Sequence, residues 1–256
     1  MKKRKASFLI SALLITLCVA PFLYIFVQTF FDQGHFTLHG YYQVFLAQTQ
    51  YLARFWRSLG LCLIIALGQL LVSLLAGYGF AKCTFPGKNA IFFLLMLLMV
   101  MPLQVTLVPN YLMLDELRLI GTDHALIWPM VFVPLGTFIM TQAYRSVSNS
   151  IVEAALLDGC GTLGVILRIA APMNKSGLVC TALLSFLDGW NMVEQPIIFL
   201  KDFDQYPLSV GLASTPPGEP ILQLVCFVLV VLPPVFLFSY FKTELVEGIA
   251  MGGKNK

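Results

Sequence analysis

The chain contains the stretch Ser150-Ile-Val-Glu-Ala-Ala-Leu-Leu-Asp-Gly-Cys-Gly-Thr-Leu-Gly-Val-Ile-Leu-Arg-Ile-Ala-Ala-Pro172, an amphipathic segment between two long apolar runs. Helical spacing of apolar and small residues predicts a short helix up to Gly159, and Gly159 and Gly161 permit a tight or left-handed turn. Thr162 is placed to cap a second short helix that reaches Ile169. Because proline disfavours helix in the residue before it, Pro172 should end that helix.

The surface of this predicted helix–turn–helix suits contact with a partner. Ala154 and Ala155 would form a flat face of small side chains, and Glu153 and Asp158 can anchor it through charge-assisted hydrogen bonds. The alternative is an amphipathic loop at the membrane interface with no special role. The residue types alone leave both interpretations open.

The composition of the chain indicates a membrane protein. Of its 256 residues, 58% are apolar and 11% are charged, whereas a soluble domain carries about 25% charged residues. A transmembrane helix needs about 20 consecutive apolar residues. We therefore predict an all-α, polytopic membrane protein with six transmembrane helices, which are Phe8–Phe31, Ser58–Ala81, Ala90–Leu114, Ala125–Tyr144, Ser176–Leu200 and Ile221–Phe241.

The distribution of basic residues predicts the orientation. Cytoplasmic loops are enriched in Lys and Arg. With both termini in the cytoplasm, the inner segments hold 12 of the 16 basic residues and the outer loops hold Arg54, Arg57, Arg118 and Lys201. The amphipathic segment, between the fourth and fifth spans, is then cytoplasmic. We divide the chain into residues 1–55, the first transmembrane helix and outer loop, and residues 56–256, a transmembrane domain with the loop 148–172 and a short cytoplasmic tail.

Ionisable residues in the fifth span are a second candidate site. Asp188, Asn191 and Glu194 are spaced so as to lie on roughly one helix face, and Trp190 adds a flat ring of the kind that stacks on sugars. Ionisable groups inside a membrane are costly and often functional. This face could line a substrate path. It could equally be polar contact between helices, with Glu194 reaching the outer boundary.

Several other chemistries are not indicated. The six cysteines have no C-x-x-C spacing, and the three histidines lie in predicted outer loops, so we expect no metal site. Gly159 to Gly164 match G-x-G-x-x-G, but no strand precedes them, which excludes a dinucleotide site. The net charge of +3 is too small to indicate nucleic-acid binding. We find no catalytic constellation and expect no enzyme.

The amphipathic segment resembles the E-x-x-x-x-D-G motif, or EAA loop, of ABC importer membrane subunits. The matching residues are Glu153, Asp158, Gly159 and Gly161, followed by Pro172. Further segments resemble the carbohydrate importers of the maltose-permease type, over about Trp56 to Lys254. These segments are Gly77–Lys82 with Phe85–Gly87, Met101–Pro109, Gly189–Asn191 followed by Pro196, Tyr206–Leu208, and Val246–Gly248 with Gly252.

The resemblance implies a permease subunit in the bacterial plasma membrane. It implies a second, often nonidentical permease subunit, two ATPase subunits that bind ATP and magnesium, and an extracytoplasmic solute-binding protein; this chain would hold no cofactor. The EAA loop would be a coupling helix that contacts an ATPase. The contact would be made by Glu153, Ala154, Ala155, Asp158, Gly159 and Gly161, while Asp188, Trp190, Asn191 and Glu194 would border the substrate path.

The chain departs from the family pattern at a few positions. Ser148 and Ser176 stand where proline is usual, Met192 stands where an acidic residue is common, and Asp188 and Glu194 are unusual. The changes in the fifth span put sugar contacts of other members in doubt and suggest a solute with its own polarity. The alternatives are an ABC permease for a noncarbohydrate solute and, more remotely, a secondary transporter or membrane enzyme.

Overall fold

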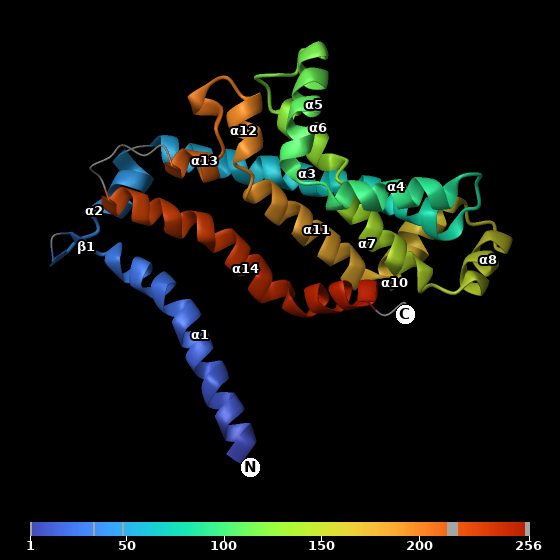
Figure 1. The fold of residues 1–256 in the computed structure, drawn as a ribbon, viewed down its shortest axis with the longest axis horizontal. Coiled ribbons are helices and arrows are strands. Elements are labelled where there is room, and N and C mark those ends of the chain that lie inside the picture. The colour runs from blue at the N-terminus through green and yellow to red at the C-terminus, as the bar shows by residue number, and fades with distance from the viewer. Residues whose placement is uncertain (1, 33, 48, 214–219, 254–256) are drawn as a thin grey trace.

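The computed structural model describes residues 2–32, 34–47, 49–213 and 220–253, and almost all of their secondary structure is helical (Figure 1). The strands in these ranges, β1 (Phe31–Asp32) and β2 (His35–Phe36), pair as an antiparallel hairpin. The helices are α1 (Lys2–Gln28), α2 (His39–Tyr42), η1 (Gln43–Ala47), α3 (Thr49–Lys82), α4 (Lys88–Val100), α5 (Leu103–Glu116), α6 (His124–Val131), α7 (Pro134–Arg145), α8 (Asn149–Leu157), α9 (Thr162–Val165), η2 (Ile166–Ala170), α10 (Ala171–Met173), α11 (Lys175–Trp190), α12 (Glu194–Phe199), η3 (Phe203–Gln205), α13 (Leu208–Ala213) and α14 (Pro220–Gly253).

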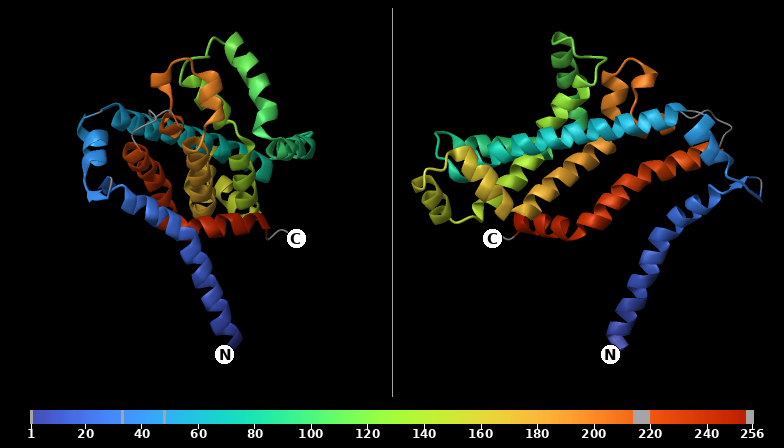
Figure 2. Two further views of the ribbon diagram at one scale, coloured as in Figure 1. Left: turned by 60° about the vertical axis from the view of Figure 1, so that its left-hand side comes forward. Right: turned by 180° about the vertical axis from the view of Figure 1, so that it is seen from behind.

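The core of the bundle is formed by α3, α7, α11 and α14, which pack along one another in all three views (Figures 1 and 2). A helix satisfies its own backbone hydrogen bonds, which lipid cannot do, so apolar runs of this length fold as helices. Within the described ranges, three helical segments are long and apolar enough to cross a membrane, Gln50–Lys82, His124–Arg145 and Pro220–Gly248. They correspond to the predicted second, fourth and sixth spans.

The predicted third span, Ala90–Leu114, is interrupted at Pro102, as its prolines predict, and is not interrupted at Pro109. It consists of α4 and α5, which meet at an angle of 107°. The break is at Met101 and Pro102, both of which have extended backbone (ψ 131° and 141°). Proline disfavours helical geometry in the residue before it, which accounts for the extended Met101. The second proline, Pro109, lies inside α5 without ending it.

The predicted fifth span, Ser176–Leu200, is also shorter than expected. The helix α11 ends at Trp190, and α12 begins separately at Glu194. Counting each bent pair of helices as one span gives up to five candidate spans, and α1 contains a shorter apolar helix at Leu13–Gln28. The total of six transmembrane helices therefore stays a prediction.

The ends of the chain differ in how they pack. Figure 2 shows α1 diverging from the bundle toward the N-terminus, and its described apolar side chains are exposed, such as Leu13 and Leu17 at 70% each. The first predicted span ended at Phe31, but α1 ends at Gln28 before the hairpin. The side chain of Phe8, together with Lys254 and Lys256 of the tail, lies outside the described residues.

The predicted outer loop from Asp32 to Arg57 is largely helical. Here α3 begins at Thr49, so the division after residue 55 falls within this helix. Tyr51, which lies in this predicted loop, is buried against α13 and α14. The sixth helix is also longer than predicted, because α14 continues through a kink at Phe241 to Gly253.

Candidate functional site

The segment α8–α10 lies at one end of the bundle, beside the end of α7 and the turn between α3 and α4 (Figure 1). The predicted helix before Gly159 is confirmed as α8, which has a buried and an exposed face. Val152 and Ala155 are buried, whereas Glu153, Ala154 and Asp158 are exposed. The expectation that both alanines share one face is wrong, because consecutive helical residues point in directions about 100° apart.

Two groups fix the start of α8. The side chain of Ser148 is the N-cap and accepts a hydrogen bond from the backbone N–H of Ser150 at 3.3 Å. The Lys82 ammonium, at the end of α3, donates to the carbonyl oxygen of Val147 and, at 2.8 Å, to Oδ1 of Asn149. In the sequence, Lys82 was named only as the last residue of the segment Gly77–Lys82 that resembles carbohydrate importers. This ammonium ties the beginning of α8 directly to a membrane helix.

The end of α8 is a Schellman motif with Gly159 in the left-handed conformation (φ +82°). The backbone N–H of Gly159 donates to the Leu156 carbonyl at 3.1 Å, and that of Cys160 donates to the Ala155 carbonyl at 3.0 Å. The predicted left-handed turn is therefore confirmed at Gly159. Gly161 has an ordinary φ of −68° and instead precedes the first residue of α9.

The second half of the segment differs from the prediction in two respects. Thr162 is the first residue of α9 and its side chain makes no capping bond, and the winding becomes π-helical over η2. Pro172 lies inside α10, and the chain turns by 91° only at Asn174. The side chain of Asn174 holds the turn at this residue through two hydrogen bonds. Its Nδ2 donates to the Ala170 carbonyl at 2.9 Å, and its Oδ1 accepts from Ser146 Oγ at 3.2 Å.

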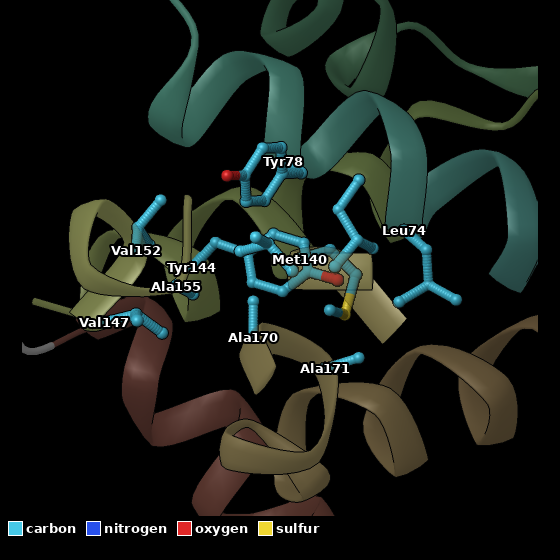
Figure 3. Packing of buried hydrophobic residues seen from close by; sticks show 11 residues of the cluster. Leu74, Tyr78, Met140, Tyr144, Val147, Val152, Ala155, Ala170 and Ala171 are labelled. Atoms are coloured by element: carbon cyan, nitrogen blue, oxygen red, sulfur yellow. The ribbon is translucent and has the colours of Figure 1, made fainter. Parts of the chain in front are cut away.

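A buried cluster joins this segment to the membrane helices (Figure 3). At its centre, Tyr144 of α7 is fully buried and packs edge-to-face against Tyr78 of α3, with ring centroids 5.8 Å apart. We call this set the Tyr144 cluster. Its members are Leu74, Tyr78, Met140, Tyr144, Val147, Val152, Ala155, Val165, Ile166, Ala170 and Ala171. The two tyrosines, each in the last turns of an apolar run, were not singled out from the sequence.

The outer surface of the segment is apolar. Leu157 is 89% exposed, and Leu156, Leu163 and Leu167 are each about half exposed. The charged side chains Glu153, Asp158 and Arg168 are exposed on the same segment. An exposed apolar patch bordered by charges is typical of a protein interface. The segment is thus packed against the bundle on its inner side and exposes apolar and charged side chains on its outer side.

The second candidate region does not form the single helix face that its spacing predicted. Asn191 is the C-cap of α11 (φ −91°, ψ 4°), and Glu194 begins α12. The Glu194 carboxylate accepts hydrogen bonds from Nε2 of Gln104 in α5, at 3.0 and 3.3 Å. Asp188 lines a cavity between α5, α7 and α12, and Asn191 is exposed. The helix break therefore places Asp188, Asn191 and Glu194 in different surroundings.

Trp190 lies in the core of the bundle with 3% of its surface exposed. Its ring stacks on Phe186, and its indole N–H donates to the carbonyl oxygen of Val230 at 2.9 Å. Pro234 lies four residues after Val230 in α14 and has no N–H to donate to that carbonyl. The indole supplies the hydrogen bond that the proline removes.

Replacing Trp190 with Phe should lower the free energy of unfolding by about 1–3 kcal/mol, since it leaves the partly buried Val230 carbonyl unpaired. The same substitution should cost less in a Pro234→Ala background, where the backbone N–H at position 234 can bond to that carbonyl. Thermal unfolding of the four purified proteins in a double-mutant cycle measures this coupling. Equal costs in both backgrounds would contradict the assigned hydrogen bond.

The described residues contain no cluster of three or more His, Cys, Asp or Glu side chains that could hold a metal ion. The G-x-G-x-x-G match spans the turn after α8 and the first residues of α9, so it follows a helix instead of a strand. The two candidate regions are an exposed surface on α8–α10 and a cavity lined by Asp188.

The chain is similar to known transport proteins. No protein-family model matches it. It is 31% identical over 206 residues to the arabinooligosaccharides transport system permease protein AraQ of Bacillus subtilis, which covers 79% of this chain and 73% of that protein. It is 28% identical over 230 residues to AraQ of Halalkalibacterium halodurans, covering 89% and 82%. The sn-glycerol-3-phosphate transport system permease protein UgpE of Escherichia coli is 25% identical over 206 residues, covering 77% and 73%.

The fold also matches a solved structure. A chain in the crystal structure of a bacterial ABC transporter involved in the import of the acidic polysaccharide alginate superimposes with a TM-score of 0.78 at 18% sequence identity. The match covers 95% of this chain and 98% of that chain. At this level of identity, the likeness shows the fold.

Proposed function

The chain belongs to the permease subunits of carbohydrate ABC importers, and we propose that it forms part of the path for a sugar or sugar derivative and receives the motion of an ATPase through α8–α10. One observation carries the second part of this proposal. Leu157 is 89% exposed beside Glu153 and Asp158, on a segment whose other face is packed into the Tyr144 cluster. A rigidly seated segment with an apolar outer surface can transmit a push to α3 and α7.

The proposed contact combines charges, small residues and a fixed turn. Glu153, Ala154 and Asp158 lie on the exposed face of α8, and Gly159 and Gly161 leave open space above the turn. Ala155 contributes from the opposite side, where it packs the helix against the bundle. The carboxylates would pair with donors of the ATPase, and the leucines would fill its cleft.

The proposed assembly contains two ATPase subunits, which bind ATP and magnesium and carry out hydrolysis. It also contains a second, nonidentical permease subunit and an extracytoplasmic solute-binding protein, in the bilayer of a bacterial plasma membrane. No cofactor is assigned to this chain, and it acts in transport without contact to nucleic acid.

The proposed orientation has α8–α10 and both termini in the cytoplasm. Lys82 ends α3, Lys88 begins α4 and Arg145 ends α7, so these charges gather at the end of the bundle that carries α8. Concentration of Lys and Arg at one membrane face supports a cytoplasmic position for that face.

Two classes of solute, a carbohydrate and a small noncarbohydrate solute, are candidates for this permease. The relatives AraQ and UgpE are named for arabinooligosaccharides and for sn-glycerol-3-phosphate. The higher identity to AraQ favours a carbohydrate, whereas the matches to UgpE favour a small noncarbohydrate solute. The ligand that the cognate binding protein retains on purification distinguishes the two.

The coupling role predicts that Glu153→Lys and Gly159→Asp each abolish solute uptake and solute-stimulated ATP hydrolysis. Disrupting a buried charge pair at an interface costs about 2–5 kcal/mol, and Gly159→Asp adds a side chain and a charge at a left-handed turn. Uptake, ATPase activity and the amount of membrane-inserted protein are measured together.

The exposed Glu116 at the end of α5 provides the matched control, Glu116→Lys, which should transport normally. Transport that survives both Glu153→Lys and Gly159→Asp would show that α8 is not the coupling element. If one of the two variants fails to insert into the membrane, the other variant still tests the coupling role.

A further inference from the structure

Three helix breaks meet at one cavity of about 750 Å³. They are the breaks between α4 and α5, between α6 and α7, and between α11 and α12. Irregular backbone at membrane depth is tolerated where it is buried in protein or lines a watery space. Residues at the first two breaks line this cavity, Met101, Phe132 and Val133. On either side of the third break, Asp188 of α11 and Gln195 of α12 line it as well.

The backbone at the second break is held by a side chain from outside the cavity. Gln69 of α3 is 2% exposed, and its Nε2 donates to the Val133 carbonyl at 3.1 Å. Val133 is the N-cap residue of α7, so this bond ties the start of α7 to α3. The interruption is therefore a supported structural feature, and the space beside it is part of the fold.

Asp188 is the charged residue among those that line the cavity, where Thr106, Asn110 and Gln195 are the polar ones. Within the described ranges, its carboxylate forms no ion pair or hydrogen bond, and no Lys, Arg or His lines the cavity. An unpaired carboxylate at membrane depth is costly, and such groups pair with a cation or serve a transport path.

We propose that Asp188 makes this cavity a binding site for solutes that carry an ammonium or guanidinium group, such as an amino sugar. The proposal rests on the importer function above and specifies its solute class. Asp188 is exposed where it lines the cavity, so a solute can reach its carboxylate, and the carboxylate would attract a cation that enters. Thr106, Asn110 and Gln195 would offer hydrogen bonds to sugar hydroxyls.

The test places a reporter thiol in the cavity of the assembled transporter. The native cysteines are replaced in all subunits, and Thr106→Cys is introduced. Its reaction rate is measured with cationic 2-aminoethyl methanethiosulfonate and with anionic 2-sulfonatoethyl methanethiosulfonate. Removing the charge by Asp188→Asn should lower the cation-to-anion rate ratio about tenfold, as expected for the loss of one nearby charge.

Val108→Cys provides the matched control on the same helix, since Val108 is 65% exposed and does not line the cavity. Its rate ratio should not change with Asp188→Asn. An unchanged ratio at Thr106→Cys would overturn the proposal, because Asp188 would then be neutral or paired with a base of the second permease subunit.

A protection experiment tests the solute class. The diammonium disaccharide of glucosamine should slow labelling of Thr106→Cys, its neutral N,N′-diacetylated form should protect less, and Asp188→Asn should remove the difference. Equal protection by both disaccharides overturns the proposal. ATP-driven uptake of the solute of the binding protein is followed in the same preparation, so failure of this inference is separable from failure of the importer function.

Discussion

Replacing Gly77 with Ala is expected to destabilise the chain by about 1–3 kcal/mol, the usual cost of overpacking a core. A Cβ atom at position 77 would lie 2.7 Å from Cβ of Met140 and 3.1 Å from the backbone nitrogen of Thr141. The helices α3 and α7 cross here, and backbone atoms cannot rotate away as a flexible side chain can. The small residue allows the close approach of helices on which packing in lipid depends.

Gly79 provides the control on the same helix, because a Cβ atom there meets nothing within 4 Å. Gly79→Ala should be neutral or stabilise the protein by up to about 1 kcal/mol, since alanine favours helix over glycine. Thermal unfolding of the two purified variants in detergent measures the difference. Equal melting temperatures would contradict the close crossing of α3 and α7.

Leucine at positions 154 and 155 is expected to abolish transport for two different reasons. Ala155 is 8% exposed inside the Tyr144 cluster, so Ala155→Leu should overpack it, lower stability by about 1–3 kcal/mol and displace α8. Ala154 is exposed, so Ala154→Leu should leave the isolated chain within about 0.5 kcal/mol of the parent. It should instead obstruct the proposed ATPase contact.

Two measurements separate these effects. Thermal unfolding of the isolated chain should change for Ala155→Leu alone, and copurification of the ATPase should fall for Ala154→Leu although that variant is as stable as the parent. If Ala154→Leu retains both the ATPase and full uptake, the exposed face of α8 is not the contact surface. If Ala155→Leu unfolds like the parent, Ala155 does not pack as described.

Much of the fold could be predicted from apolar runs and glycine chemistry. The helix α8 and the left-handed turn at Gly159 follow from local sequence, because both depend on neighbouring residues. The 107° angle between α4 and α5 does not, because a proline such as Pro102 permits a kink or a complete break. The choice depends on which distant helices cover the interruption. The end of α11 at Trp190 is likewise set by packing against α14.

The sequence predicted which residues belong to the candidate site better than it predicted the directions in which their side chains point. The spacing identified Glu153 and Asp158, but it could not show that Ala155 faces inward and Ala154 outward. Lys82 and Tyr144 were missed as anchors, because their partners lie 65 or more residues away or in another helix. Such contacts become visible only when the topology brings α3, α7 and α8 together.

The junction of α11 and α14 bears on how hybrid permeases can be built. Ser176 Oγ donates to Glu247 at 2.6 Å, and Lys175 pairs with Glu244 at 3.9 Å. A Cβ atom on Gly248 would lie 2.5 Å from Cβ of Cys180 and 2.8 Å from the Ser176 carbonyl oxygen. These contacts make the two segments one exchangeable unit. A chimera that takes its final helix from a relative must therefore take residues 175–180 from the same parent.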